Sequence, residues 1–224
     1  MDTSSQRSSS PKKLIFLSVT IGAALLFSVY AMLWSFNRLP RSSPPPLLGQ
    51  MPSFEMLNQE GKTINDTDLK GSILIIDFFF TRCPSICPRL TTHMVEIDQS
   101  LLKRWKELAN PLPVRLLSIT VDPENDTPPQ LLRYAQKYGA DASRWFFLTG
   151  ESQDLDRVVI QGFKLFYQKA NPSAGIMEIM HGNWLVLVDQ KGNIRGYYDA
   201  EDAQRAKQLL RDVEWLALQK PHEL

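Results

Sequence analysis

The residues best suited to chemistry in this 224-residue chain are its two cysteines, Cys83 and Cys87. They lie four positions apart in the segment Cys-Pro-Ser-Ile-Cys-Pro, which directly follows the apolar run Ile73–Phe80. Two sulfur atoms at the end of a buried strand can form a disulfide, attack a disulfide in a substrate, or bind a soft metal ion. The spacing therefore predicts one site with three alternative chemistries.

These cysteines are expected to lie where a strand meets a helix. Pro88 fits the first turn of a helix at residues 89–108, because a missing amide proton costs little there. Side chains four residues apart on a helical turn share one face, so Cys87 can lie beside Cys83. The positive end of the helix is expected to stabilise a thiolate at this position.

Alternating strands and helices are expected around this junction. A strand, helix, strand, helix order followed by a hairpin and a last helix predicts an α/β fold, a three-layer α/β/α sandwich with an N-terminal β-hairpin. The expected strands are 73–80, 114–121 and 145–148; the hairpins are 53–57 with 62–65 and 184–189 with 193–198; the helices are 89–108, 128–139, 154–161 and 203–218.

One transmembrane helix is expected before this domain. The segment Leu14–Phe36 carries no charge, and at about 1.5 Å per residue it can cross the roughly 30 Å hydrocarbon layer. Arg7, Lys12 and Lys13 precede it and favour a cytoplasmic N-terminus. A cleaved signal peptide is the alternative, but the apolar run is longer than usual for one. The expected parts are a cytoplasmic tail (1–13), a signal anchor (14–36), a Pro-rich linker (37–50) and an extracytoplasmic domain (51–224).

The composition limits the classes of function. The 25 basic and 24 acidic residues balance, and no cluster of Lys and Arg forms a basic face, so nucleic acid is a poor candidate partner. A hydrophobic content of 43% suffices for one ordinary core. Two cysteines form at most one disulfide within the chain, so this is not a disulfide-stabilised protein class. Outside the cytoplasm thiols are not kept reduced by default, so the cysteine pair indicates a redox or metal task.

Three segments resemble the Sco/SenC family of membrane-anchored, thioredoxin-like copper chaperones for cytochrome c oxidase assembly. They are TRCPSICP (81–88), SITVDPENDTP (118–128) and MHGNWLVLVDQKGNIRGYYD (180–199). The resemblance spans about Met51 to Leu218, and its most specific element is CPxxCP together with VDPxxDTP. It implies a thioredoxin-like fold and one copper ion bound by Cys83, Cys87 and His181.

The resemblance also implies a task and its partners. Family members help to metallate, or to reduce, the dinuclear copper centre of cytochrome c oxidase, so the implied role is a metallochaperone rather than an enzyme. The implied partners are the copper-centre subunit of the oxidase and either a periplasmic copper donor or a thioredoxin-like reductant. Because the N-terminal tail is short for a transit peptide, we expect the bacterial inner membrane, with the domain in the periplasm.

Thiolates favour Cu(I), and an added imidazole makes a site tolerable to Cu(II). A site with three ligands also leaves room for an incoming ligand, which suits transfer of the ion.

Other ligands and other functions stay open from the residues alone. His93 is expected to point away from the sulfur atoms, His222 lies in the polar tail, and Met177 and Met180 are soft donors of a type that more often fills a core. Residues flanking His181 depart from the family, whose members often have an acidic residue before this histidine. A thiol:disulfide oxidoreductase with a redox-active cysteine pair, or less readily a thiol peroxidase, would not require a histidine ligand.

Five further residues carry expectations. Asp122, Asp126 and Thr127 are expected to cap the helix that starts at 128, with a role in shaping a partner surface as the alternative. Asp77 is expected to be hydrogen-bonded at a strand position near the sheet edge. Arg82 either lowers the pKa of a neighbouring thiolate or is a solvated charge.

Overall fold

The computed structural model describes residues 11–36, 43–84, 86–107, 113–165 and 183–219. It comprises two units, Met1–Pro40 and Arg41–Leu224. The described part of the first unit is the helix α1 (Pro11–Phe36). Within the part of the chain that the structure describes, no helix is both long and apolar enough to cross a membrane. The transmembrane anchor expected at 14–36 therefore stays a prediction.

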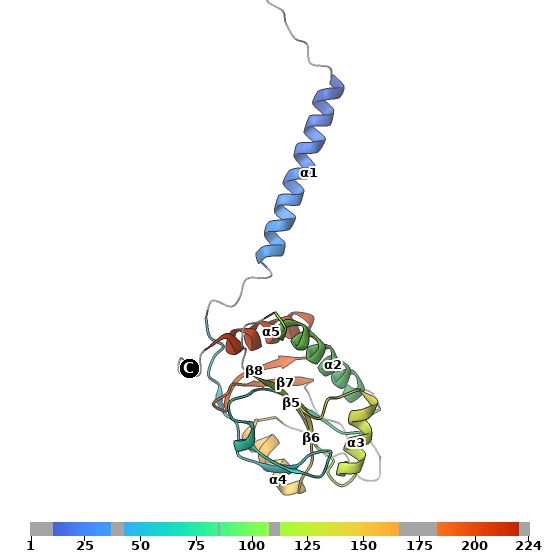
Figure 1. Ribbon diagram of the computed structural model, residues 1–224, viewed down its shortest axis with the longest axis vertical. Coiled ribbons are helices and arrows are strands. Elements are labelled where there is room, and N and C mark those ends of the chain that lie inside the picture. Colours follow the sequence, from blue (N-terminus) through green and yellow to red (C-terminus); the bar gives the residue numbers. More distant parts are fainter. Residues whose placement is uncertain (1–10, 37–42, 85, 108–112, 166–182, 220–224) are drawn as a thin grey trace, which may run out of the picture. The chain divides into compact units, whose positions relative to one another are not determined.

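A six-stranded mixed sheet forms the centre of the second unit (Figure 1). Its strand order is β1-β8-β7-β4-β5-β6. The strands β4, β5 and β6 run parallel, whereas β7, β8 and β1 join by antiparallel pairing. The strands are β1 (Gly49–Gln50), β4 (Ile73–Phe79), β5 (Val114–Thr120), β6 (Trp145–Leu148), β7 (Trp184–Val188) and β8 (Asn193–Asp199).

Strand β4 lies inside the sheet, and every one of its residues is buried. Both faces of the sheet are therefore covered, as a continuous apolar run in a parallel pair requires. In Figure 1, α2 and α5 lie on one side of the sheet and α4 on the other. The helices of this unit are α2 (Ile86–Trp105), α3 (Pro128–Lys137), α4 (Ser152–Asp156), which continues as a π-helix (Arg157–Gly162), and α5 (Ala203–Leu218), with a short 3₁₀ helix (Asp66–Leu69) before β4.

Most of the expected elements are confirmed. The first hairpin consists of β2 (Glu55–Leu57) and β3 (Thr63–Asn65), and its loop turns through Gly61 with a φ of 74°. The strand at 145–148 and the last helix begin and end where the sequence predicts. The helix after the cysteines is displaced from the expected 89–108, because it starts at Ile86.

The outer edge of strand β6 is hydrogen-bonded to a side chain in place of a further strand of the sheet. Gln59, in the loop of the first hairpin, is 2% exposed. Its Nε2 donates to the Trp145 carbonyl at 3.0 Å, and the Phe147 amide donates to its Oε1 at 2.9 Å. The amide of Gln59 thus pairs with β6 as a neighbouring strand would.

At the opposite edge, the segment before β1 is fixed to the sheet. The Arg195 Nε donates to Asp189 Oδ2 at 2.7 Å, and the Asp189 side chain is fully buried. The Nη1 of Arg195 donates to the Pro45 carbonyl at 3.2 Å. Ordered structure of the sheet therefore begins before the expected domain start at Met51.

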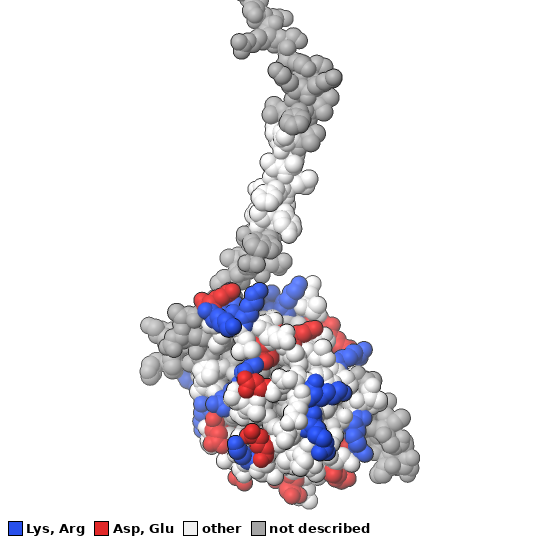
Figure 2. Space-filling view, turned by 45° about the vertical axis from the view of Figure 1, so that its right-hand side comes forward, with Lys and Arg blue, Asp and Glu red and all other residues white. Residues whose placement is uncertain are grey.

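Charged side chains of both signs are mixed on the face of the domain shown in Figure 2. This face therefore shows no large area of a single charge.

Candidate functional site

The structure brings the two cysteines together between β4 and α2. The amide of Cys87 donates to the Cys83 sulfur at 3.3 Å. Both residues are described as thiols rather than as a disulfide. Cys87 is fully buried and Cys83 is partly exposed. Of the two cysteines, Cys83 is the one with exposed surface among the described residues.

Local sequence explains why the pair adopts this geometry. Helix α2 starts at Ile86, so Cys87 lies in its first turn, where backbone amides have no partner within the helix. The Cys83 sulfur accepts one of these amides and so completes the start of the helix. Pro88, also in the first turn, has no amide proton to satisfy. The expected placement of both sulfur atoms at a helix start is confirmed.

Burial affects the pKa of the Cys87 thiol more than the helix N-terminus does. Desolvation raises the pKa of the Cys87 thiol, and the hydrogen bond with Cys83 raises it further. A low-dielectric surrounding disfavours the thiolate more than the helix terminus favours it. Without a bound metal, Cys87 therefore retains its proton in the reduced protein.

Asp77 is a buried carboxyl group on the strand that leads to the cysteines. Its side chain is 0% exposed and accepts a hydrogen bond from Ser118 at 2.5 Å, while Ser118 accepts one from Trp145 Nε1 at 2.9 Å. The other oxygen, Oδ2, has no hydrogen-bond partner among the described residues. Desolvation by burial raises the pKa of Asp77 to about 7, which the Ser118 bond only partly opposes. The expected position near the sheet edge is wrong, since β4 lies between β7 and β5.

A second buried carboxylate, Asp126, contacts the segment that precedes Cys83. The Thr81 amide donates to Asp126 Oδ2 at 3.0 Å, and the Thr81 hydroxyl donates to Oδ1 at 2.5 Å. The Thr120 hydroxyl, at the end of β5, donates to Oδ2 at 2.5 Å. Asp126 is 0% exposed, and burial raises its pKa, with these hydrogen bonds in opposition.

The neighbouring residue Asp122 contacts the same segment. The Arg82 Nη2 donates to Asp122 Oδ2 at 3.0 Å, so the Arg82 charge is paired rather than only solvated or directed at a thiolate. The expectation that these acids cap helix α3 is wrong. Thr127 occupies the N-cap position without a side-chain hydrogen bond, and Asp122 and Asp126 contact the residues before Cys83 instead.

Of the remaining candidate ligands, the structure describes only His93. His181, Met177, Met180 and His222 lie outside the described residues. His93 is described: its Nδ1 lies 3.2 Å from Glu96 Oε2 on the exposed face of α2. Within the described ranges, no group of three or more His, Cys, Asp and Glu side chains could hold a metal ion. The described part of the site therefore supplies two sulfur donors.

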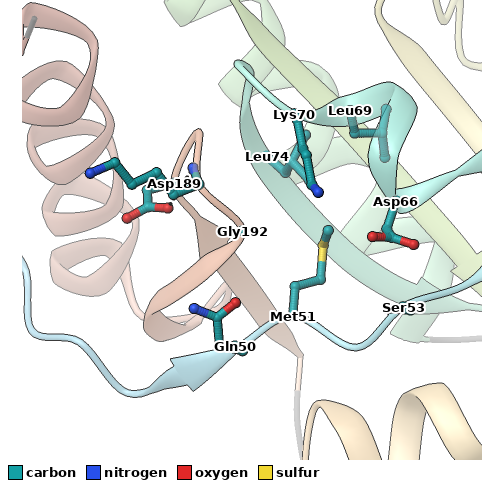
Figure 3. Close-up of a pocket in the computed structure, with 10 residues that line it drawn as sticks. Gln50, Met51, Ser53, Asp66, Leu69, Lys70, Leu74, Asp189 and Gly192 are labelled. Carbon is teal, nitrogen blue, oxygen red and sulfur yellow. Dashed lines mark hydrogen bonds between the residues drawn. The ribbon is translucent and has the colours of Figure 1, made fainter. Parts of the chain in front are cut away.

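A separate cavity of about 200 Å³ lies at the other end of β4 (Figure 3). Its lining includes Leu74 near the start of β4, whereas the cysteines follow the end of that strand. Met51 points into this space from the segment after β1, and Asp66 and Lys70 point into it from the 3₁₀ helix before β4 and its C-cap. Since strands extend by about 3.3 Å per residue, the cavity and the sulfur atoms are separated by most of the length of the sheet.

The fold and the cysteine site together define a class: a thioredoxin-like α/β domain with a pair of thiols where a central strand meets a helix. Residues 46–218 match the SCO1/SenC family. Because this match covers most of the chain, the protein belongs to the SCO1/SenC family.

Comparison with individual proteins agrees with this assignment. The chain is 32% identical to the SCO1 protein homolog of Bacillus subtilis over 169 residues, which cover 75% of this chain and 83% of that protein. It is 29% identical to BsSco, a member of the Sco family of cytochrome c oxidase assembly proteins with a disulfide switch; the TM-score is 0.68, covering 80% of this chain and 100% of the other. Bradyrhizobium japonicum ScoI, solved with copper bound, shares the fold at 23% identity and a TM-score of 0.61, covering 75% of this chain and 99% of that one.

Proposed function

We propose that this protein binds copper and delivers it to the dinuclear copper centre of cytochrome c oxidase, or reduces the cysteines of that centre. The observation that carries the proposal is the Cys83–Cys87 pair, in which the Cys83 sulfur accepts the Cys87 amide at 3.3 Å at the start of α2. Membership of the SCO1/SenC family and the relation to BsSco support the oxidase as the partner.

Copper is the cargo in this proposal, and the two sulfur donors suit it. Thiolates are soft ligands that favour Cu(I). Since Cys87 is buried with a raised pKa, binding must displace its proton, and copper affinity should therefore increase with pH. We propose His181 as the third ligand, and the sulfur of Cys83, the less buried of the two cysteines, as the atom that first exchanges copper with a partner.

A copper titration of the reduced, full-length chain tests the proposal. With a chromophoric Cu(I) chelator as competitor, we expect one copper ion per chain. Replacing either cysteine by serine should abolish tight binding, and His181→Ala should weaken it by about 10- to 100-fold or more, as for loss of an important group at a metal site. The control is His93→Ala, because His93 contacts Glu96 on an exposed helix face. Unchanged affinity in His181→Ala would refute the three-ligand site.

A thiol:disulfide oxidoreductase is the second candidate, favoured by the accessibility difference between the sulfur atoms and by Asp77. In this reaction the Cys83 thiolate attacks a substrate disulfide and forms a mixed disulfide, and Cys87 then displaces the reduced substrate. The protein becomes a disulfide, and the two protons of its thiols pass to the substrate sulfur atoms. Asp77, buried with a pKa of about 7, can hold a proton near neutral pH.

The two candidates differ in their need for His181. An oxidoreductase should reduce a model disulfide at the same rate in His181→Ala as in the parent protein, and this rate should be lost in Cys83→Ser. A copper chaperone without this activity should reduce the same disulfide no faster than a small dithiol. Both results are obtained on metal-free protein, so they are independent of the titration.

We also infer that residues 14–36 anchor the chain in the bacterial inner membrane, with residues 1–13 in the cytoplasm and the domain from 51 onward in the periplasm, joined by the linker 37–50. The absence of charge between Leu14 and Phe36 supports this arrangement. A fusion of alkaline phosphatase to the C-terminus should be active in the periplasm and remain with the membrane fraction. An inactive fusion would contradict this orientation.

A further inference from the structure

The residues that precede Cys83 are held by a different part of the chain. Thr81 and Arg82 each contact a carboxylate of the loop that joins β5 to α3. The Val121 amide also donates to the Phe79 carbonyl at 2.9 Å, so the ends of β4 and β5 are joined directly next to this loop. The position of Cys83 therefore depends on residues about 40 positions later in the sequence.

Asp126 makes the larger set of these contacts. Its two carboxylate oxygens accept hydrogen bonds from the Thr81 amide, the Thr81 hydroxyl and the Thr120 hydroxyl. The Thr81 hydroxyl oxygen in turn lies 3.3 Å from the Gln130 Nε2 donor on α3. Asp126 therefore joins the end of β5, the start of α3 and the segment before Cys83 at one buried point.

We propose that Asp126 is the positioning residue of the cysteine site: by fixing Thr81 it keeps the Cys83 sulfur at the first turn of α2. Only one residue, Arg82, lies between Thr81 and Cys83 in the chain. The Cys83 amide donates to the Phe80 carbonyl at 3.3 Å, which leaves this short segment little freedom once Thr81 is fixed. The inference extends the proposed function. It rests on that function in the measurement of copper affinity, but not in the measurement of the disulfide equilibrium.

The donors around Asp126 explain why asparagine should hold Thr81 less firmly. All the contacts to its side chain come from donor groups, and both of its oxygens accept. The amide of asparagine has one oxygen and one NH₂ group, so one acceptor becomes a donor that faces other donors. The NH₂ group can bond a threonine hydroxyl only if that hydroxyl accepts and turns its own proton elsewhere. The bonds that remain are also weaker, because they are no longer made to a carboxylate. The contact that fixes the segment before Cys83 is therefore weakened.

Two measurements on the full-length chain test this role. The first is the affinity for Cu(I), which we expect to fall by about 10-fold or more in Asp126→Asn, the lower end of the range for loss of a group that orients a metal ligand. The second is the equilibrium of the Cys83–Cys87 pair with glutathione in metal-free protein. We expect its constant to change by about 10-fold, because the geometry of the two sulfur atoms decides how readily they join.

A matched control separates positioning from general stability. Asp98 is also a largely buried carboxylate, and it binds Arg144 through two hydrogen bonds of 2.9 and 2.7 Å. Asp98→Asn should lower the urea midpoint, yet leave the copper affinity and the glutathione equilibrium within twofold of the parent protein. Equal effects of Asp98→Asn and Asp126→Asn on both readouts would overturn the proposal, since stability alone would explain them.

Thr81→Val gives a second variant in case Asp126→Asn does not fold. It removes the hydroxyl donor but retains the backbone donor, so both readouts should change in the same direction by a smaller factor. Values within twofold of the parent protein in every folded variant would overturn the positioning role. If the parent protein binds no copper, the proposed function fails, while the glutathione equilibrium still decides the role of Asp126.

Discussion

Replacing Asp77 by asparagine should stabilise the folded domain at neutral and alkaline pH. Asp77 is fully buried, and one of its oxygens has no hydrogen-bond partner among the described residues. An ionised carboxylate in such a place lacks the solvation that water gives to the unfolded chain. Asparagine has nearly the same shape, keeps an oxygen for the Ser118 hydroxyl, and never ionises.

The magnitude follows from the pKa of Asp77, which burial raises from 3.8 to about 7. A raised pKa means that the folded state binds the proton more tightly than the unfolded state, so stability decreases as pH rises between these two values. The full decrease amounts to about 4 kcal/mol, at about 1.4 kcal/mol per pH unit. Below pH 3.8 the penalty is absent, and above about pH 7 it is complete.

Urea unfolding of the reduced chain, followed by circular dichroism from pH 4 to pH 8, measures this effect. The difference in free energy of unfolding between Asp77→Asn and the parent protein should grow by about 4 kcal/mol in favour of asparagine over this range. Other titrating groups occur in both proteins and largely cancel in the difference. A difference that does not change with pH would refute the assignment of a raised pKa to Asp77.

Asp141→Asn provides a control of opposite sign. Hydrogen bonds from Ser143, and then the Arg144 charge, lower the pKa of Asp141. Its stabilising contribution is therefore present above the unfolded-state pKa and is lost as pH falls. Relative to the parent protein, Asp141→Asn should become less stable as pH rises towards about 4, so the measurement for this variant extends below pH 4.

Three further outcomes follow from contacts described above. Gln59→Ala leaves two buried backbone groups of β6 without partners and should lower the free energy of unfolding by about 2 to 4 kcal/mol in urea; a loss below about 1 kcal/mol would contradict the edge contact. Iodoacetamide should label Cys83 in Cys87→Ala at least about tenfold faster than Cys87 in Cys83→Ala, as followed by mass spectrometry, because reactivity requires exposure; equal rates would contradict the burial difference. Arg195→Met leaves the Asp189 carboxylate buried without its cation and should cost about 3 kcal/mol, with faster proteolysis before β1; unchanged resistance to protease would show that this contact does not fix the segment.

Local patterns in the sequence were sufficient for most of the fold. The apolar run that forms β4, the four residues of β6 and the amphipathic pattern of α5 each predict an element by their own period or length. The hairpin at Gly61 is equally local, because its turn residues lie within the loop. Such elements could be predicted because the information for each lies inside one short segment.

Features that depend on distant segments could not be predicted in this way. Strand β1 is only two residues long, and it exists because residues 193–194 offer it a pairing edge. The contacts of Asp126 were missed for the same reason, since an acid just before a helix has the pattern of a cap. A signal was present in Thr81 and Thr120, which follow or end two apolar runs, but only the pairing of β4 with β5 brings them together.

In the cysteine site, too, local features could be predicted and features that depend on distant segments could not. The spacing of Cys83 and Cys87 and the proline after them predicted two sulfur atoms at a helix start, as found. The burial of Cys87 could not be derived from spacing, because it depends on how α2 packs on the sheet. The contribution of His181 stays a prediction, since it lies outside the described residues.

The contact between Gln59 and β6 also bears on whether copies of this protein associate. An exposed strand edge offers unpaired amides and carbonyls to any other extended chain, including a second copy. On β6 the side chain of Gln59 occupies the Trp145 carbonyl and the Phe147 amide, and the opposite edge strand, β1, has only two residues. Pairing with β1 covers only residues 193–194 of β8, so it is at the β6 edge that backbone groups are occupied. The sheet therefore cannot readily extend from β6 into a second molecule.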